Sequence, residues 1–267
     1  MENAIFLSRS AFWQGAGTTG YHTQGWLLAP TPTFPSLPSF TRSDMVIASH
    51  PLRPPKPHAG EVLYRRYCAA VGKSLEFVAF DIDGDPKRDG GLSQHMAAFH
   101  KWHNDERVNS AWGERGSLET HRDYIKGLLA DPGVVPIMMR WNGELMGYVE
   151  IVWAKENHVA QYYPPDSPVG NWERGLHVLV GEDKFLGGCK FEPISELWLR
   201  SLVHYIFLAD PRTNRVVGEP KQTNSVILKA AQSAGFHNHA TFDFPYKRSC
   251  LLFNPRERFF SNTDRLY

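Results

Sequence analysis

The sequence predicts an α/β (α+β) fold in which strands and helices pack around a shared core. Segments with apolar residues at alternate positions are interleaved with segments whose apolar residues recur at helical spacing. The chain has 267 residues, of which 42% are hydrophobic and 13% aromatic, so it can bury a sizeable core. No internal repeat is evident. These observations favour a mixed central sheet flanked by helices.

The N-terminal region differs from the rest of the chain. The segments "LAPTPTFPSLPSF" (28–40) and "SHPLRPPKPHAG" (49–60) are rich in proline and show no sustained apolar period. Such composition is typical of extended linkers. We therefore expect an extended proline-rich arm or linker, partly disordered, over residues 1–60, and a globular domain over residues 61–267.

The globular region can be divided by its apolar patterns and turn residues. In order, the expected elements are a short helix at 61–72, a strand at 74–82, a helix at 90–108 that breaks near Asn104 and Asp105, a helix at 117–133, a strand hairpin at 134–154, a strand at 175–181, a helix at 194–210, a strand at 214–220, a helix at 223–236 and two strands at 239–253.

Local signals support several of these boundaries. Ser117 is a suitable N-cap for the helix that follows it. Asn142 and Gly143 predict a type I′ turn between two strands. Gly235 is a natural residue to follow the C-terminus of a helix, and Pro193 suits a first helical turn.

Composition and charge exclude several function classes. The formal net charge is +1, which does not favour nucleic acid or an anionic membrane as a partner. The three cysteines, Cys68, Cys189 and Cys250, are widely spaced and indicate a reducing compartment. No apolar run reaches transmembrane length, and neither end carries a convincing signal peptide or peroxisomal tripeptide. We expect a cytoplasmic protein, with the peroxisome left open.

Three histidines in one predicted helix raise the alternative of a metal site. His95, His100 and His103 lie close together in "HMAAFHKWH", and the last two are three residues apart. No carboxylate or cysteine completes a recognisable ligand set around them. A polar helix face is the simpler interpretation, and we expect no metal.

The step from strand 175–181 through a glycine-containing loop to helix 194–210 indicates an anion site. Backbone N–H groups in such a loop and the positive end of the helix dipole can bind phosphate. The element order around it resembles the GCN5-related N-acetyltransferase fold, in which this strand splays from its neighbour to admit the pantetheine arm of acyl-CoA. The segment "KFLGGC" matches the family's pyrophosphate loop in part, at Lys184, Gly187 and Gly188.

A narrower resemblance covers residues 75–255. The sequence is similar to siderophore-biosynthesis acyltransferases, including the fungal N5-hydroxyornithine branch, the aerobactin-pathway hydroxylysine acetyltransferase and the mycobactin lysine N-acyltransferase. The matching stretches are "WHNDERVNSAW" (102–112), "GYVEIVWA" (147–154), "YYPPDSPVGNWERGLHVLVG" (162–181), "HYIFLADPRTNRVVGEPKQTN" (204–224) and "AGFHNHATFDFPYKRSCLLF" (234–253).

This resemblance implies transfer of an acyl group from acyl-CoA to the hydroxylated side-chain amine of ornithine or lysine, which gives a hydroxamate. The co-substrate would be acetyl-CoA or a branched unsaturated acyl-CoA, and no metal is required. The alternative is a catalytically inactive acyl-CoA-binding or partner module derived from such an enzyme. Homodimerisation is left open.

The resemblance also implies the catalytic residues. His177 matches the histidine of the family's strand, where it would contact the hydroxylamine oxygen or the reacting carbonyl; a core histidine is the alternative. Some relatives carry an aspartate where this chain has Lys221, so that role does not carry over. Glu219, close by in the sequence, is our own candidate for the general base. The alternatives are that Glu219 is a turn carboxylate and that His177 or water suffices as base. Lys221 would instead meet the substrate carboxylate or a CoA phosphate.

The remaining expected site residues fall into two groups. Arg107 and Trp112 have alternative structural roles, pairing with nearby acids and packing in the core, and Asn224 has the alternative role of a helix N-cap. The expected substrate-binding residues are Asn104, Arg107, Trp112, Glu150, Tyr163, Glu173, Arg174 and Lys221. The expected acyl-CoA-binding residues are Val178, Val180, Lys184, Gly187, Gly188 and Asn224.

Overall fold

The computed structural model describes residues 26–28, 37–43, 46–85, 92–186 and 194–261. Its elements are β1 (Trp26–Leu28), β2 (Pro38–Arg42), β3 (Ile47–Pro51), β4 (Val62–Cys68), η1 (Ala69–Val71), β5 (Lys73–Ala79), α2 (Gln94–Asn104), α3 (Glu106–Trp112), α4 (Leu118–Ala130), β6 (Val134–Trp141), β7 (Glu144–Trp153), η2 (Ala154–Glu156), η3 (His158–Tyr162), β8 (Arg174–Val180), η4 (Asp183–Phe185), α5 (Ile194–Ala209), β9 (Arg215–Gly218), α6 (Ser225–Ser233), β10 (His237–Phe244), β11 (Lys247–Pro255) and α7 (Arg256–Ser261).

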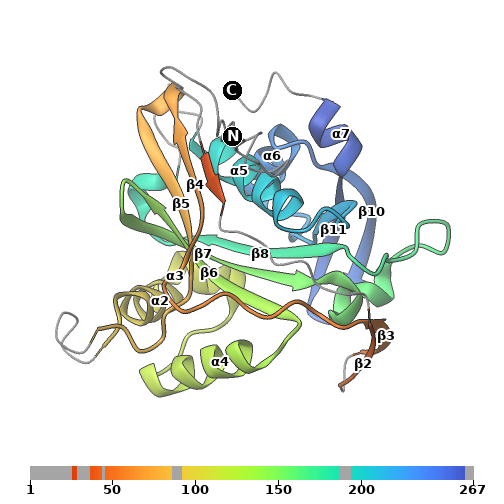
Figure 1. Ribbon diagram of the computed structural model, residues 1–267, viewed down its shortest axis with the longest axis horizontal. Helices are drawn as coiled ribbons and strands as arrows, with labels where there is room; N and C mark the ends of the chain where they lie inside the picture. The colour runs from red at the N-terminus through yellow and green to blue at the C-terminus, as the bar shows by residue number, and fades with distance from the viewer. Residues whose placement is uncertain (1–25, 29–36, 44–45, 86–91, 187–193, 262–267) are drawn as a thin grey trace, which may run out of the picture.

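A central sheet organises the fold, with strand order β1-β4-β5-β6-β7-β8-β9-β11-β10. Neighbouring strands are antiparallel except β8 and β9, which are parallel. Helices α5 and α6 cover one face, and α2, α3 and α4 cover the other (Figure 1). Each face has its own core: Phe207 and Trp198 belong to the first, and Phe99 and Tyr148 to the second. The predicted mixed sheet with flanking helices is therefore confirmed.

Most predicted elements of the globular region are found, with the local signals that predicted them. Ser117 caps α4 by accepting a hydrogen bond from the backbone N–H of Thr120. Asn142 and Gly143 have φ values of 48° and 82°, as a type I′ turn requires. Gly235 follows α6 with φ of 101°. The predicted helix break is also found, between α2 and α3.

The predicted helix at 61–72 is wrong, because this segment forms β4 and the short turn η1. Tyr64 and Arg66 point to the same buried side of the strand, and both are under 5% exposed. The guanidinium of Arg66 donates a hydrogen bond to the hydroxyl of Ser201 at 2.9 Å. A buried charged side chain conceals the alternation that would otherwise mark a strand.

The described part of residues 1–60 contacts the globular region at several points. Strand β1 pairs with β4 at the edge of the central sheet. Strands β2 and β3 form a separate hairpin. Arg53 binds Glu156 and donates to the backbone carbonyl of Asn171 at 2.7 Å. The segment predicted as an arm therefore includes regular structure and specific anchors.

A close contact at the end of β8 yields a stability prediction. A Cβ added to Gly181 would lie 2.0 Å from the ring of Trp102, which is 1% exposed and donates to Glu182. Gly181→Ala should therefore destabilise the fold by about 3 kcal/mol or more, because the buried indole must move. Urea unfolding monitored by circular dichroism measures this. Gly127→Ala, within α4 and with open space around it, is the control and should stabilise by up to about 1 kcal/mol. An unchanged midpoint for Gly181→Ala would contradict the contact.

Candidate active site

The sheet opens between β8 and β9. Strand β8 pairs with β7 along its whole length, from Arg174 to Val180. With β9 it pairs only at Arg174, Gly175 and Leu176. Pro220, two residues beyond β9, has no N–H, and its carbonyl accepts from Cys250 of β11. Among the described strands, none pairs with positions 177–180 on this side. This open edge can offer its backbone polar groups to an extended ligand.

His177 is the first residue beyond the paired part of β8, and two carboxylates flank its ring. Its Nδ1 atom lies 2.9 Å from Oε2 of Glu150, which is directly opposite on β7. Its Nε2 atom lies 3.3 Å from Oε1 of Glu219, which follows β9. The His177 side chain is 24% exposed, whereas those of Glu150 and Glu219 are 5% and 11% exposed. The structure therefore brings three predicted site residues together at the opening of the sheet.

Hydrogen bonds hold Glu150 in place and keep it ionised. Its Oε1 atom accepts from the hydroxyls of Tyr124 at 2.7 Å and Tyr148 at 3.1 Å. Burial alone would raise the pKa of Glu150, but the bond from His177 and those from the two tyrosines lower it overall. Glu150 is therefore a carboxylate at neutral pH, and it orients the imidazole.

The two carboxylates determine the charge of His177. Burial alone would lower its pKa, but Glu219 and Glu150 outweigh this effect and raise the pKa of His177 to about 10. The pKa of Glu219 is lowered, because His177 and Lys247 offset its burial. At neutral pH the cluster is thus an imidazolium between two carboxylates. Such a group can donate hydrogen bonds but cannot accept a proton.

Further residues complete the surroundings of Glu219. Lys247 of β11 has its ammonium 3.8 Å from the Glu219 carboxylate and donates to the Glu219 backbone carbonyl at 3.2 Å. His158 lies with its ring 6.4 Å from that of His177 and 5.0 Å from Phe244. Lys247, His158, Tyr124 and Tyr148 were not among the predicted site residues. Tyr148 is two residues before Glu150 on β7, so strand alternation could have placed it beside that carboxylate. The other three lie on segments distant in sequence, and only the fold brings them to the site.

Arg107 has a structural role that its residue type did not reveal. Its guanidinium donates to the backbone carbonyls of Val180 and Gly181, each at 2.9 Å, and to Asp183 at 3.0 Å. It therefore fixes the end of β8 to α3. Of the two predicted roles for Arg107, the structure shows the pairing with a nearby acid, Asp183. The donors of its guanidinium are bound to groups of the protein itself.

The predicted acyl-CoA residues are only partly described. Val178 and Val180 are half-buried on the open part of β8 and pack against the core below α5. Lys184 in η4 forms an ion pair with Glu144. Gly187 and Gly188 lie outside the described residues. Asn224 caps α6 by accepting from the backbone N–H of Ile227.

Asn104 and Trp112 lie on the helices that cover the His177 face. The side-chain amide of Asn104 donates to the backbone carbonyls of His100 and Gly116, and its oxygen accepts from Gly116. This exchange joins the end of α2 to the loop before α4. The ring of Trp112 lies 5.3 Å from His103 and 6.1 Å from Tyr148, at the edge of the second core. The contacts of both residues are structural.

Tyr163 and Glu173 form a separate cluster. The Tyr163 hydroxyl donates to Glu173 at 2.9 Å, and Glu173 pairs with Arg215 at 2.7 Å. Burial, followed by the adjacent carboxylate, raises the pKa of Tyr163. Arg174 stacks on Trp153, with 3.7 Å from its guanidinium carbon to the ring centre. Because Arg174 is three positions before His177 on a strand, its side chain points to the opposite face of the sheet. None of these three side chains has a described contact with His177.

Lys221 is exposed and forms a single β-bridge with Ser249. Among the described lysines, Lys247 rather than Lys221 approaches Glu219.

The three histidines of α2 have separate partners. His95 accepts from the backbone N–H of Asp81, His100 meets His121 at 2.8 Å, and His103 bonds to the carbonyl of Phe99.

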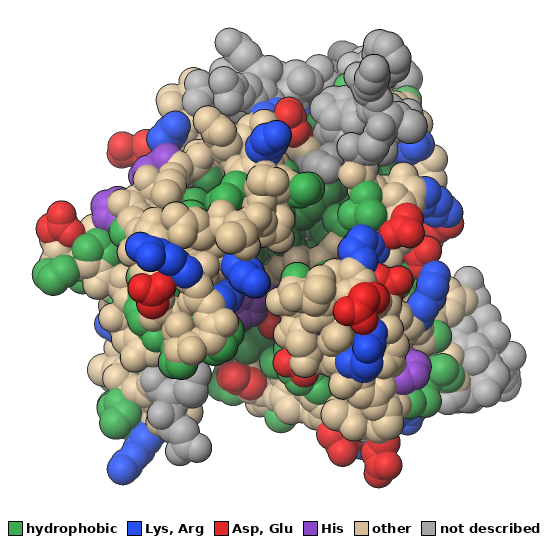
Figure 2. Space-filling model, turned by 180° about the vertical axis from the view of Figure 1, so that it is seen from behind, with side chains coloured by type: hydrophobic (Ala, Val, Ile, Leu, Met, Phe, Trp, Pro, Cys, Tyr) green, Lys and Arg blue, Asp and Glu red, His purple; other side chains and the backbone are tan. Residues whose placement is uncertain are grey.

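Within the described part of the chain, no helix has the length and hydropathy needed to cross a bilayer. One molecular face mixes basic and acidic side chains and is hollowed near its middle, where hydrophobic and histidine side chains are visible (Figure 2). No single sign of charge dominates that face.

Comparison with known proteins identifies the family. A family model described as an acetyltransferase (GNAT) domain matches residues 91–244. A hydroxyornithine transacylase from Ajellomyces capsulatus is 38% identical over 96% of this chain and 58% of its own length. An N(5)-hydroxyornithine:cis-anhydromevalonyl coenzyme A-N(5)-transacylase from Beauveria bassiana is 36% identical over 94% of this chain and 57% of its own. The chain thus spans 57–63% of the length of the first curated relatives.

A shorter relative and two solved structures agree with this result. An N(6)-hydroxylysine O-acetyltransferase from Escherichia coli is 32% identical over 96% of this chain and 71% of its own length. An uncharacterised protein from Bacillus halodurans shares the fold with a TM-score of 0.65, at 23% identity over 78% of this chain and 98% of its own. Aminoglycoside acetyltransferase AAC(6')-Ib bound to coenzyme A also shares the fold, with a TM-score of 0.55. It is 22% identical, and the match covers 63% of this chain and 93% of its own. The chain belongs to the GNAT acetyltransferase family, and its resemblance to the hydroxyornithine and hydroxylysine acyltransferases is confirmed.

Proposed function

We propose that this chain transfers an acyl group from acyl-CoA to the N-hydroxylated side-chain amine of ornithine or lysine, in siderophore biosynthesis. The observation that carries the proposal is the Glu150–His177–Glu219 cluster at the point where β8 leaves β9. The hydroxyornithine and hydroxylysine substrates in the names of its relatives support this choice of acceptor.

The open edge of β8 is the proposed site for the pantetheine arm. An extended chain that carries amide groups can pair with the free backbone beside Val178 and Val180. Helix α5 begins at Ile194, and the positive end of its dipole suits the pyrophosphate. Lys184 can contribute charge there only if it leaves its ion pair with Glu144.

His177 acts in this proposal as a cationic hydrogen-bond donor. The hydroxylamine nitrogen attacks the thioester carbonyl carbon, and negative charge develops on the carbonyl oxygen. The imidazolium, oriented by Glu150, can turn its Nε2–H from Glu219 to this oxygen. Collapse of the intermediate breaks the carbon–sulfur bond and releases CoA thiolate.

Glu219 is the proposed proton acceptor. The attacking nitrogen becomes acidic once it bonds to carbon, so even a carboxylate of lowered pKa can accept its proton. The proton then passes to the thiolate and leaves as the CoA thiol. A free hydroxylamine is largely unprotonated at neutral pH, so no strong base is needed to prepare it.

The test of this function is an acyl-transfer assay on the purified chain. Acetyl-CoA and a branched unsaturated acyl-CoA are each combined with N5-hydroxyornithine, N6-hydroxylysine and the two unhydroxylated amino acids. We expect thiol release and a hydroxamate, identified by mass and by its coloured ferric complex, with a hydroxylated acceptor only. Thiol release with an ester product, or equal turnover of unhydroxylated amino acids, would contradict the proposal. Acyl-CoA binding without turnover would instead indicate an inactive module.

A further inference from the structure

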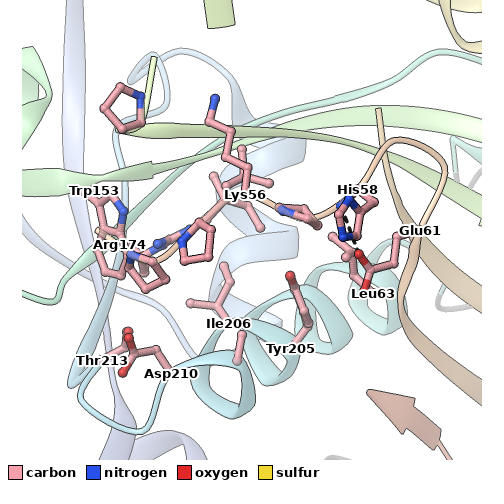
Figure 3. A pocket seen from close by; sticks show the side chains of 17 residues that line it. Lys56, His58, Glu61, Leu63, Trp153, Arg174, Tyr205, Ile206, Asp210 and Thr213 are labelled. Carbon is pink, nitrogen blue, oxygen red and sulfur yellow. Dashed lines mark hydrogen bonds between the residues drawn. The ribbon is translucent and has the colours of Figure 1, made fainter. Parts of the chain in front are cut away.

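A cavity of ≈ 520 Å³ lies on the face of the sheet opposite His177. Its walls come from α5, from the β7 and β8 strands and from the proline-rich segment 54–57 (Figure 3). The volume is within the ~300–1,000 Å³ range of small-molecule sites. Most of the lining is apolar, including Leu63, Ile151 and Ile206. Its volume and largely apolar lining leave room for a small molecule, and the proposed acyl transfer does not use it.

Arg174 gives the cavity a positive charge without a close counter-ion. Its guanidinium stacks on Trp153 at 3.7 Å, and Arg53 lies over the same indole ring at 4.1 Å. Among the described residues, no carboxylate is within ion-pair distance of Arg174, and its side chain makes no hydrogen bond. Burial lowers the pKa of Arg174 to about 10, so the group stays charged at neutral pH. The side chain is half-buried, so its unused N–H donors are available to a ligand in the cavity.

Tyr205 adds a second polar group that faces the same space. It projects from α5 into the cavity between Ile206 and His58 (Figure 3). Within the described structure its hydroxyl has no hydrogen-bond partner. A phenol and a guanidinium together can bind both oxygens of a carboxylate.

The other charged groups of the lining are already engaged. Lys56 donates to the backbone carbonyls of Leu128 and Leu129. Asp210 pairs with Arg212 at 2.8 Å. Glu61 accepts from the backbone N–H of His58 at 3.0 Å. Among the described lining residues, Arg174 is therefore the cation whose donors remain unused, and a single guanidinium matches a monoanion better than a phosphate dianion.

We propose that this cavity binds a small monocarboxylate with an apolar body, its carboxylate on Arg174 and Tyr205 and its apolar part against the proline segment and Ile206. The site lies on the far side of the sheet from the acyl-transfer cluster. Its occupancy does not depend on the proposed function, so the two can be tested separately.

Calorimetric titration of the full chain with hexanoate and with neutral hexanamide tests the proposal. We expect hexanoate to bind at least tenfold more tightly than hexanamide, because only the carboxylate pairs with the guanidinium. Arg174→Gln should weaken hexanoate binding at least tenfold and Tyr205→Phe several-fold. Lys56→Gln is the matched control: it removes a lining charge that is already engaged, and affinity should change less than twofold.

Three results would overturn the proposal. They are no detectable hexanoate binding, equal affinity for hexanoate and hexanamide, and undiminished binding to a folded Arg174→Gln variant. If Arg174→Gln does not fold, the comparison of the two ligands on the unmodified chain still decides the question. Hexyl phosphate binding more tightly than hexanoate would also contradict the choice of a monocarboxylate.

Discussion

Replacing His177 with glutamine is expected to lower kcat about 10²–10³-fold, while the KM for acyl-CoA changes less than about threefold. Glutamine can still donate a hydrogen bond from nearly the same place, but it carries no positive charge for the developing oxyanion. The ring nitrogens of His177 lie 2.9 Å and 3.3 Å from Glu150 and Glu219. Steady-state kinetics of hydroxamate formation measure the effect.

A second histidine provides the control for this variant. His239 of β10 is exposed, and its ring stacks on Phe253 at 4.6 Å. His239→Gln should retain kcat within about twofold, since the residue has no described contact with the cluster. Unchanged turnover in His177→Gln would remove the histidine from the mechanism.

Glu219→Gln should also have a lower kcat, because the amide cannot accept the proton that the proposed mechanism passes to the Glu219 carboxylate.

The stability of the fold should fall in alkaline solution because of the same histidine. Its pKa is 6.5 in an unfolded chain and about 10 in the folded one. Folding therefore favours the charged form, and this contribution is complete below about pH 6.5. It is lost as the pH rises through about 10, and its size is on the order of 3–5 kcal/mol.

Urea unfolding of the original chain and of His177→Gln between pH 6 and 10 measures this contribution. Other groups titrate in this range in both proteins, so the difference between them isolates His177. We expect the stability advantage of the original chain to shrink as the pH rises. A constant difference across the range would contradict a raised pKa of His177.

Periodicity and turn chemistry predicted most of the globular fold. The N-cap at Ser117 and the turn at Asn142 and Gly143 depend on bonds between near neighbours, so the sequence reports them directly. Strand β4 was mistaken for a helix because Arg66 occupies a buried position, where it donates to Ser201, a residue far along the chain. The strands before residue 60 were also missed, because their proline-rich sequence has no clear alternation.

The site could be predicted in part, and the limit has a physical reason. His177 was recognised as an unusual polar residue in an apolar strand, and Glu150 and Glu219 by the motifs around them. Their mutual contact depends on strand register and on where β9 stops pairing. Arg174 was expected to bind substrate from the loop before the strand, but it is the first residue of β8, and strand alternation directs it to the face opposite His177.

The most direct test of the mechanism is the protonation state of His177 in the folded chain. Nitrogen-15 NMR of histidine-labelled protein, titrated from pH 5 to 11 and assigned with His177→Gln, measures it. We predict an imidazolium with both ring nitrogens protonated at pH 8, titrating near pH 10. A neutral ring at pH 8 with a pKa near 6.5 would contradict the cationic role and would leave His177 able to act as a base.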